Sequence, residues 1–320
     1  MSLLGKLRRR VLTPDISETK VAVRGFHVKD PAAKDLLETV GSSFLEGYAY
    51  AAEASRTADA LASLERMPTR FKGFAYEGAA MGFAVRDGLP FGGGQTKKFL
   101  AGPGDRHVYM AYVGVGWAMA RLPRFRWSAM HAPDPLLHWL LMDGYGFHQA
   151  YFRTQRYVHE QYRETGFPYP ASGSHPYTDH AIDQGIGRAL WFVGGTDVKC
   201  VKQLLDRFPA HRHADLYSGV GLAATYAGGV DRAELRELRR VSGKLYPHLA
   251  QGAAFAASAR ERAGLIVAHN ELAAEVLCGM SVVEAAAICD LSRPGEDVPG
   301  DVPAYEIWRR RIRQEFGAEE

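Results

Sequence analysis

The sequence predicts an all-α protein of stacked helix pairs, arranged as an open solenoid or a closed toroid. A short pattern recurs along the chain: a polar residue, one or two glycines, and then small and bulky apolar residues, as in Asp183-Gln-Gly-Ile-Gly-Arg-Ala-Leu-Trp-Phe. The first glycines of seven copies are spaced 30 to 41 residues apart, at Gly47, Gly78, Gly114, Gly144, Gly185, Gly219 and Gly252. Self-similarity at such a period is typical of helical repeat proteins.

Two of these copies align without a gap, which indicates internal duplication. Leu64-Glu-Arg-Met-Pro68 precedes Gly78 by the same distance that Leu205-Asp-Arg-Phe-Pro209 precedes Gly219. A glycine inside a helix costs about 1 kcal/mol relative to alanine, so each copy needs a reason to keep one. Two explanations fit: the glycines allow a neighbouring helix to approach closely, or they line a site where a ligand crosses several helices.

The chain reads as one continuous body, because a repeat array grows by adding units and need not split into domains. We expect a basic helix and an extended segment over residues 1–30, with Lys20 to Val28 alternating like a strand. The helical body spans 31–292 and carries a loop insertion at 166–180, and an acidic, proline-rich loop and a closing helix occupy 293–320. Helices are predicted from Pro31 onward and over 55–67, 107–122, 136–163 (one helix or two), 183–192, 198–208, 214–226, 232–241, 246–262, 271–280 and 304–316.

Composition narrows the function classes. Thirty-nine basic against 36 acidic residues is too balanced to predict nucleic-acid binding. Three cysteines in no recognised spacing favour a reducing cytoplasm, and no apolar run is long enough for a membrane helix. The first helix has an apolar stripe beside a basic face, which fits either packing on the body or docking on a membrane or partner.

Polar residues precede most of the repeat glycines, and these are the best candidates for chemistry. They include Glu77, Asp143 and Asp183, with Glu46, Gln184, Ser218 and Gln251 at comparable places. If the copies superpose, these side chains converge, and carboxylates converging in an apolar setting acquire displaced pKa values. The competing explanation is helix N-capping, which favours Asp and Ser.

His148 and Arg188 each follow a candidate carboxylate by five residues, and Arg188 is suited to clamp an anionic end of a substrate. The predicted catalytic set is therefore Glu77, Asp143, His148, Asp183 and Arg188. Glycine-lined helix ends and nearby aromatic rings give a predicted substrate-binding set of Gly144, Gly185, Trp191 and Tyr217.

No metal site and no cofactor are predicted. His211, His213 and Asp215, and His175, Asp179 and His180, have ligand types at short spacing, but no recognised metal signature is present. Gly88 to Lys98 is glycine-rich without the phosphate-loop pattern, and neither a hydrolase elbow nor a dinucleotide fingerprint occurs.

Several segments together resemble a known family: Arg24-Gly-Phe-His-Val, Asp183-Gln-Gly-Ile-Gly-Arg, Asp215-Leu-Tyr-Ser-Gly-Val-Gly, Leu277-Cys-Gly-Met-Ser and Pro303-Ala-Tyr-Glu-Ile-Trp. The chain is similar to the UnbL-type protein of the conserved enediyne biosynthesis cassette, also catalogued as a domain of unknown function. The resemblance implies a role in converting a linear conjugated polyene to the enediyne core, beside a polyketide synthase, a thioesterase and a membrane protein. It brings no established catalytic residues.

Two hypotheses follow. The first is a cytoplasmic, cofactor-independent enzyme or enzyme component that binds the polyene in an apolar groove and moves protons. The second is a non-catalytic repeat scaffold or carrier that joins partner enzymes, reaching the membrane through a partner.

Overall fold

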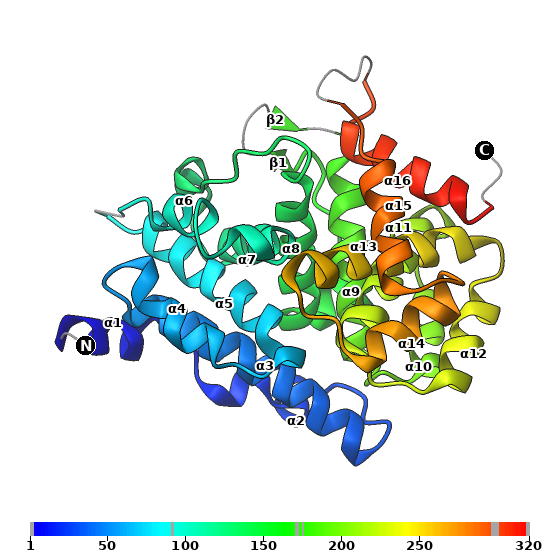
Figure 1. The fold of residues 1–320 in the computed structure, drawn as a ribbon, viewed down its shortest axis with the longest axis horizontal. Coiled ribbons are helices and arrows are strands. Elements are labelled where there is room, and N and C mark those ends of the chain that lie inside the picture. Colours follow the sequence, from blue (N-terminus) through cyan, green and yellow to red (C-terminus); the bar gives the residue numbers. More distant parts are fainter. Residues whose placement is uncertain (1–2, 91–92, 170–172, 175, 296–300, 318–320) are drawn as a thin grey trace.

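The computed structural model describes residues 3–90, 93–169, 173–174, 176–295 and 301–317, and their regular secondary structure is almost entirely helical (Figure 1). The exception is a short antiparallel pair, β1 (Pro168–Tyr169) and β2 (Gly173–Ser174), inside the predicted loop insertion. The all-α class predicted from the glycine pattern is therefore confirmed for the described part of the chain.

Seven long helices carry the repeated glycines and form the interior. We call them the central helices: α3 (Pro31–Glu53), α5 (Thr69–Gly88), α7 (Val108–Arg121), α8 (Trp139–Phe152), α9 (Thr178–Val193), α11 (His213–Ala227) and α13 (Tyr246–Ala263). Each packs on the next in chain order. Shorter segments connect them: α4 (Thr57–Glu65), α6 (Gln95–Leu100), α10 (Val198–Leu205) and α12 (Arg232–Ser242).

The Gly-x-Gly pairs explain how one helix can pack closely on two neighbours. In α9, a Cβ added to Gly185 would lie 1.9 Å from the carbonyl oxygen of Asp143 in α8. One added to Gly187 would lie 2.1 Å from that of Leu216 in α11. Positions two apart point to nearly opposite sides of a helix, because each residue turns the helix by about 100°. The first glycine therefore admits the preceding helix and the second admits the following one.

The same arrangement holds at Gly114 and Gly116 in α7, at Gly144 and Gly146 in α8, and at Gly219 and Gly221 in α11. In every case the atom that a Cβ would meet is a backbone oxygen about 2 Å away. Close helix packing, the first of the two explanations for the repeated glycines, is thus what the structure shows at these positions.

The row of central helices curls so that its later members return to its early ones. Phe74 in α5 and Tyr226 in α11 make an edge-on ring contact with centroids 5.1 Å apart. Arg260 in α13 donates to the backbone oxygen of Arg70 in α5 at 3.1 Å. The interior is consequently enclosed by helices that are far apart in the sequence.

Both ends of the chain lie outside this row. α1 (Leu3–Leu12) is followed by a 3-10 turn, η1 (Ile16–Thr19), and α2 (Val21–Arg24). The predicted strand over Lys20 to Val28 is wrong, because Val21 to Arg24 close a helical turn that Gly25 ends with φ of 68°. At the other end, α14 (Ala268–Leu277) and α15 (Val282–Leu291) pack beside α13, and α16 (Ala304–Glu315) closes the chain.

Two further differences from the prediction concern one additional helix and one helix boundary. The sequence pattern did not predict α15, whose buried side is formed largely by alanines and a cysteine. Over 136–163 the chain forms α8 and then a single π-helical turn, η4 (Gln155–His159), because Arg153 leaves the helical conformation with ψ of 48°. The remaining predicted helices are present with shifted ends, and α9 begins at Thr178, five residues before its predicted start and inside the predicted loop insertion.

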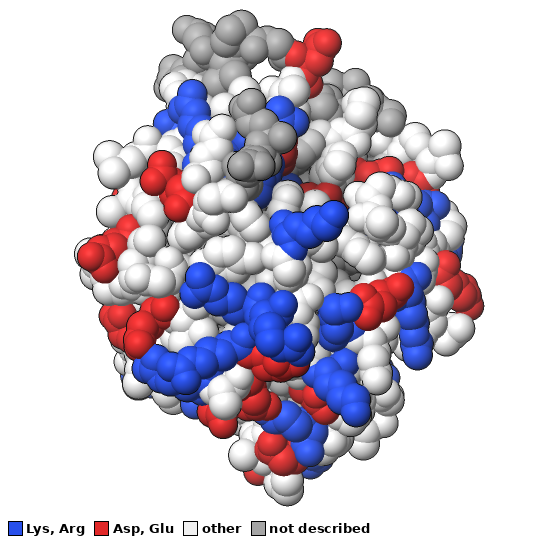
Figure 2. Space-filling model, turned by 90° about the vertical axis from the view of Figure 1, so that its right-hand side faces the viewer, with Lys and Arg blue, Asp and Glu red and all other residues white. Residues whose placement is uncertain are grey.

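The outer surface carries mixed charges. Figure 2 shows Lys and Arg beside Asp and Glu over much of one face. On α12, for example, Arg232 pairs with Glu275 at 2.6 Å and Arg240 pairs with Glu237 at 2.6 Å. Among the described residues no single helix is long and apolar enough to cross a membrane, and only the bent pair of α14 and α15, at 63°, passes on combined length and composition.

Gly187→Ala tests the close packing. The added methyl group would overlap the carbonyl of Leu216, so we expect a loss of about 3 kcal/mol in the free energy of unfolding, measured by urea denaturation. Gly295→Ala is the control, because Gly295 is exposed and its added Cβ would meet no atom within 4 Å. Equal stability of the two variants would contradict the packing argument.

Candidate functional site

The enclosed interior contains a narrow apolar cavity of about 70 Å³. Six of the seven central helices, α3, α5, α7, α8, α9 and α11, supply its walls. Most of the lining side chains are aromatic or aliphatic, including Phe44, Tyr48, Phe74, Met81, Trp117, Phe147, Tyr151 and Phe192. The charged side chains Glu77 and Arg188 and the ring of His148 also reach this wall.

Glu77, Asp143 and Arg188, three of the five predicted catalytic residues, meet in this interior. Their exposed fractions are 3%, 1% and 5%. Arg188 forms an ion pair with Asp143, and its other terminal nitrogen lies 3.8 Å from Glu77 Oε1. The guanidinium also lies 5.0 Å from the ring centre of Phe147, so one cation is shared by two carboxylates and an aromatic face.

This geometry leaves Glu77 poised near neutrality. Burial raises the pKa of Glu77, Arg188 opposes the rise, and the negative charge of Asp143 adds to it, giving a pKa of about 7. Burial also acts to lower the pKa of Arg188, but Asp143 and Glu77 hold it above its usual value. Arg188 therefore stays charged and Glu77 is the group that can gain or lose a proton.

A second cavity of about 30 Å³ lies on the other side of the same cluster. It is lined by residues of α7, α8, α13 and α16, among them Phe255, Tyr305 and Trp308. The two cavities share Arg188, Leu222 and Tyr226 in their walls. These three side chains therefore separate the two cavities, which we refer to together as the channel.

The polar residues before the repeat glycines form a hydrogen-bonded row. Gln184 donates to Asp143 at 2.8 Å, and the Ser218 hydroxyl lies 2.8 Å from Gln251 Oε1 and 3.5 Å from Gln184 Oε1. All four lie within helices, so the convergence predicted from sequence is confirmed for them and N-capping does not explain them.

Glu46 lies outside the row and is exposed. The packing register explains the difference. A repeat glycine usually faces the backbone carbonyl of the residue directly before the repeat glycine of the preceding central helix, as at Gly114, Gly185, Gly219 and Gly252. By the same rule Gly78 would face Glu46, but it faces Phe44. The shift of two residues turns Glu46 away from the interior.

His148 lines the apolar cavity but does not join the charged cluster. Burial, together with the charges of Arg121 and Arg153, lowers the pKa of His148 to about 3 against the opposing effect of Gln149. Neither ring nitrogen has a hydrogen-bond partner of good geometry among the described residues. The imidazole is thus a neutral, unpaired group at the cavity wall, edge-on to Trp117 with centroids 5.5 Å apart.

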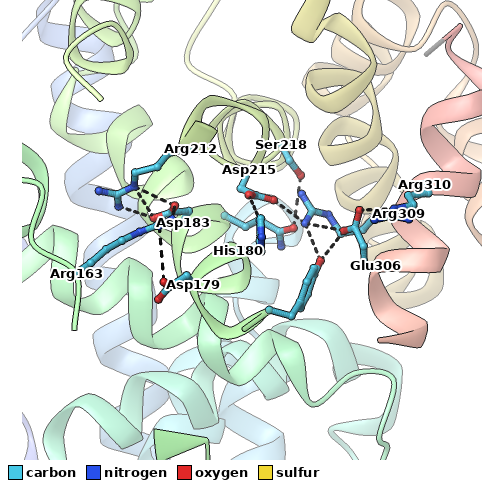
Figure 3. Close-up of polar contacts among 12 residues, drawn as sticks. Arg163, Asp179, His180, Asp183, Arg212, Asp215, Ser218, Glu306, Arg309 and Arg310 are labelled. Carbon is cyan, nitrogen blue, oxygen red and sulfur yellow. Dashed lines mark hydrogen bonds and ion pairs between the residues drawn. The ribbon is translucent and has the colours of Figure 1, made fainter. Parts of the chain in front are cut away.

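Asp183 is separated from the cluster and belongs to a different ion-pair group. It accepts from Arg212 Nε at 3.0 Å and pairs with Arg163, as Figure 3 shows. Burial raises the pKa of Asp183 against the opposing effect of both arginines. The structure gives this carboxylate a role in joining α9 to the start of α11, and it lines neither part of the channel.

The four predicted substrate-binding residues do not line the channel either. Gly144 and Gly185 lie against backbone oxygens at helix crossings. Trp191 is fully buried and donates its indole N–H to the Gly228 oxygen at 3.0 Å. The Tyr217 hydroxyl points toward the Val241 oxygen, 3.4 Å away in α12. All four residues therefore contribute to helix packing.

A second polar group is centred on Arg309 of α16, which the sequence patterns did not single out; its members Asp215 and His180 were considered from sequence only as metal-ligand types. Figure 3 shows Arg309 between Asp215 and Glu306, with His180 turned toward Asp215. Arg309 donates to Asp215 at 2.8 Å and to Gln251 at 3.2 Å, which joins this group to the buried row. His180 Nδ1 lies 2.7 Å from Asp215 Oδ2.

His180 borders an open cleft of about 1510 Å³ between the starts of α9 and α11 and the segment that leads into α16. The hydrogen bond to Asp215 raises the pKa of His180, although burial opposes it. Burial alone would raise the pKa of Asp215, but Arg309 and His180 hold it below its usual value. A fixed carboxylate therefore orients a half-exposed imidazole beside the cleft.

The described residues contain no group of three or more His, Cys, Asp or Glu side chains arranged to hold a metal ion. His175, one of the ligand types considered from sequence, lies outside the described residues. His211 and Asp215 both border the cleft, but Asp215 is committed to Arg309 and His180.

The fold and the site define an all-helical protein with a buried acid-base cluster in an apolar channel. Residues 3–316 match a family described as a protein of unknown function, DUF1702, and the chain belongs to that family. No curated protein and no solved structure shows significant similarity to the chain.

Glu77→Gln should change how stability depends on pH. The folded pKa of about 7 lies above the ordinary 4.5, so the folded state binds more protons than the unfolded state between these values. The Glu77 contribution to the free energy of unfolding should fall by about 3 kcal/mol as pH rises from 4.5 through 7. Urea denaturation at pH 5 and pH 8 measures this fall, which the variant should lack.

The exposed Glu46→Gln is the control for this comparison and should keep the wild-type pH dependence. A wild-type slope unchanged by Glu77→Gln would show that Glu77 does not titrate in this range.

Asp215→Asn should lower the pKa of His180, because it removes the carboxylate that raises this pKa and leaves the burial that lowers it. An NMR titration of the imidazole signals measures the shift. Asp179→Asn is the control, because Asp179 is adjacent to His180 in the sequence but pairs with Arg163, and this variant should leave the pKa of His180 unchanged. An unchanged pKa of His180 in Asp215→Asn would contradict the proposed effect of Asp215 on His180.

Proposed function

We propose that this protein acts on a long, flat, apolar molecule in the central channel, with Glu77 as the proton-transferring group. The supporting observation is that Glu77, with a pKa of about 7, borders an apolar, aromatic-lined cavity. General acid-base catalysis works best when the pKa of the catalytic group lies near the working pH. Burial of the site also keeps water from a reactive intermediate.

The shape of the channel favours an unbranched substrate. Its walls are formed by closely packed helices, and the cavities of about 70 and 30 Å³ are narrow. Movement of the Leu222 and Tyr226 side chains would join them into a longer slot. The resemblance to UnbL-type proteins supplies a substrate class of this shape, the linear conjugated polyene of enediyne core formation.

The proposed reaction is a shift of double bonds. Glu77 as carboxylate takes a proton from one carbon of the chain, the electron pair of that C–H bond moves into the conjugated system, and the proton returns at another carbon. The product has the same mass and no redox partner is consumed. Arg188, predicted from sequence to clamp an anionic end, instead compensates Asp143 and tunes Glu77, because both carboxylates already occupy its guanidinium.

We also propose that the central helices descend from a repeated unit and form a helical-repeat array. Pro68 and Pro209, which align in the sequence, both precede central helices and have nearly the same backbone angles, φ −55° and −57° with ψ 138° and 142°. The recurrent contacts of the Gly-x-Gly pairs support the same inference.

A second candidate is a non-catalytic carrier or scaffold for partner enzymes of such a pathway. The observation that favours it is the closed interior, in which most glycines are used for helix packing and the cavities are small. In this case the polyene would bind, or partners would assemble on the surface, without a chemical change.

The test is to incubate the purified protein with a linear conjugated polyene and follow absorbance, mass and chromatographic retention. We expect a product of unchanged mass and shifted spectrum. Glu77→Gln should lower the rate about 100-fold, because a general base contributes on that order. Asp143→Asn should also lower the rate by changing the charge balance around Glu77.

Asp183→Asn is the matched control, because Asp183 is equally buried but lies in the separate ion-pair group. It should retain turnover wherever it remains folded, as judged by circular dichroism. Binding without any product would support the carrier, and full turnover by Glu77→Gln would overturn the proposed base.

A further inference from the structure

The N-terminal helix α1 contacts the rest of the protein through Arg8 and Arg9. Arg8 donates to the backbone oxygens of Ala52, Glu53 and Ala54 at 2.9 to 3.1 Å, and Arg9 pairs with Glu53 at 2.8 Å. These oxygens belong to the last turn and the end of α3, where a helix leaves carbonyl groups without internal partners. A cation at this end also complements the helix dipole.

The apolar side of α1 consequently faces outward. Leu3, Leu4, Leu7 and Val11 are 86%, 62%, 56% and 71% exposed. At 3.6 residues per turn they fall on one side of the helix. An amphipathic helix that only packs on its own protein normally buries this stripe, so the orientation is the reverse of the usual one.

Neighbouring residues extend this apolar stripe and place positive charge along one edge of it. Leu7, Val11 and Leu12 border a shallow groove with Leu89 and Pro90, and Leu89 is 39% exposed. Lys6 and Arg10, both exposed and one helical turn apart, lie along one edge of the stripe. Figure 1 shows α1 at the edge of the molecule, far from α15 and α16.

We propose that α1 binds the surface of a bilayer that contains anionic lipids. The leucines and Val11 enter the boundary between headgroups and acyl chains, and Lys6 and Arg10 lie at the level of the lipid phosphates. An exposed apolar ridge with a cationic flank is the form of a helix that lies in a membrane interface. The contacts of Arg8 and Arg9 keep this side turned outward.

One short helix gives weak, reversible binding, because few apolar side chains enter the lipid. Binding brings the body to the membrane surface without inserting a spanning segment. This inference is independent of the chemistry proposed for the channel, since α1 lines neither of its cavities.

Flotation of the full chain with vesicles tests the proposal. We compare vesicles of phosphatidylcholine alone with vesicles that also contain phosphatidylglycerol. Roughly 30 mole percent of this anionic lipid gives the surface charge needed for electrostatic attraction. We expect binding to the mixed vesicles, about tenfold weaker binding to the neutral ones, and loss of the bound fraction at high salt.

The double variant Leu4→Asp and Leu7→Asp should reduce the bound fraction about tenfold or more. Leu291→Asp is the matched control, because Leu291 is 86% exposed on α15, away from α1, and it should bind as the wild type does. Circular dichroism and thermal unfolding show that each variant is folded; both replacements are at exposed positions.

Absence of wild-type binding to anionic vesicles would overturn the proposal, as would equal binding by the double variant. Sedimentation equilibrium provides a further test. A wild-type dimer that the double variant converts to a monomer would identify the stripe as a contact between copies, and this also would overturn the lipid assignment.

Discussion

The structure depends on the close approach of helix backbones through glycine. A Cβ at Gly185, Gly187 or Gly219 would meet a carbonyl oxygen about 2 Å away, so no other residue permits the observed spacing. Because the paired glycines open both sides of a helix, each of the four helices that carry a pair, α7, α8, α9 and α11, packs closely on two neighbours. The cost of glycine in a helix is offset by the contacts that this close approach allows.

The same contacts bring polar side chains together in the interior. When Gly185 rests on the carbonyl of Asp143, Gln184 comes within hydrogen-bonding distance of the Asp143 side chain. A hydrogen-bonded row is thereby built into an otherwise apolar core. Buried polar groups need such partners, because an unpaired one loses the hydrogen bonds it would make to water.

Glu77 differs from the other buried polar groups because it can gain or lose a proton near neutral pH. Its carboxylate is farther from Arg188 than that of Asp143, so burial outweighs the attraction and the proton is held weakly near neutrality. The row continues through Gln251 and Arg309 to Asp215 and His180 at the open cleft. The channel and the cleft are therefore linked by hydrogen bonds across five helices, α8, α9, α11, α13 and α16.

The sequence by itself determined the helical class, the central helices and the convergence of Asp143, Gln184, Ser218 and Gln251, because glycine spacing and apolar periodicity are local signals that each copy repeats. Only the tertiary structure decided which charges meet. Arg309 reaches Asp215 over 94 positions in the chain and Arg188 reaches Asp143 over 45, and no local pattern encodes such pairs. Packing register also turned Glu46 outward, although Glu46 directly precedes a repeat glycine as Glu77 does. Asp183 stands two residues before Gly185, so it points about 100° away from Gln184 and lies beside Arg212. The outward stripe of α1 has the same origin, because the carbonyl groups at the end of α3 bind its arginines and thereby fix which side of the helix faces the solvent.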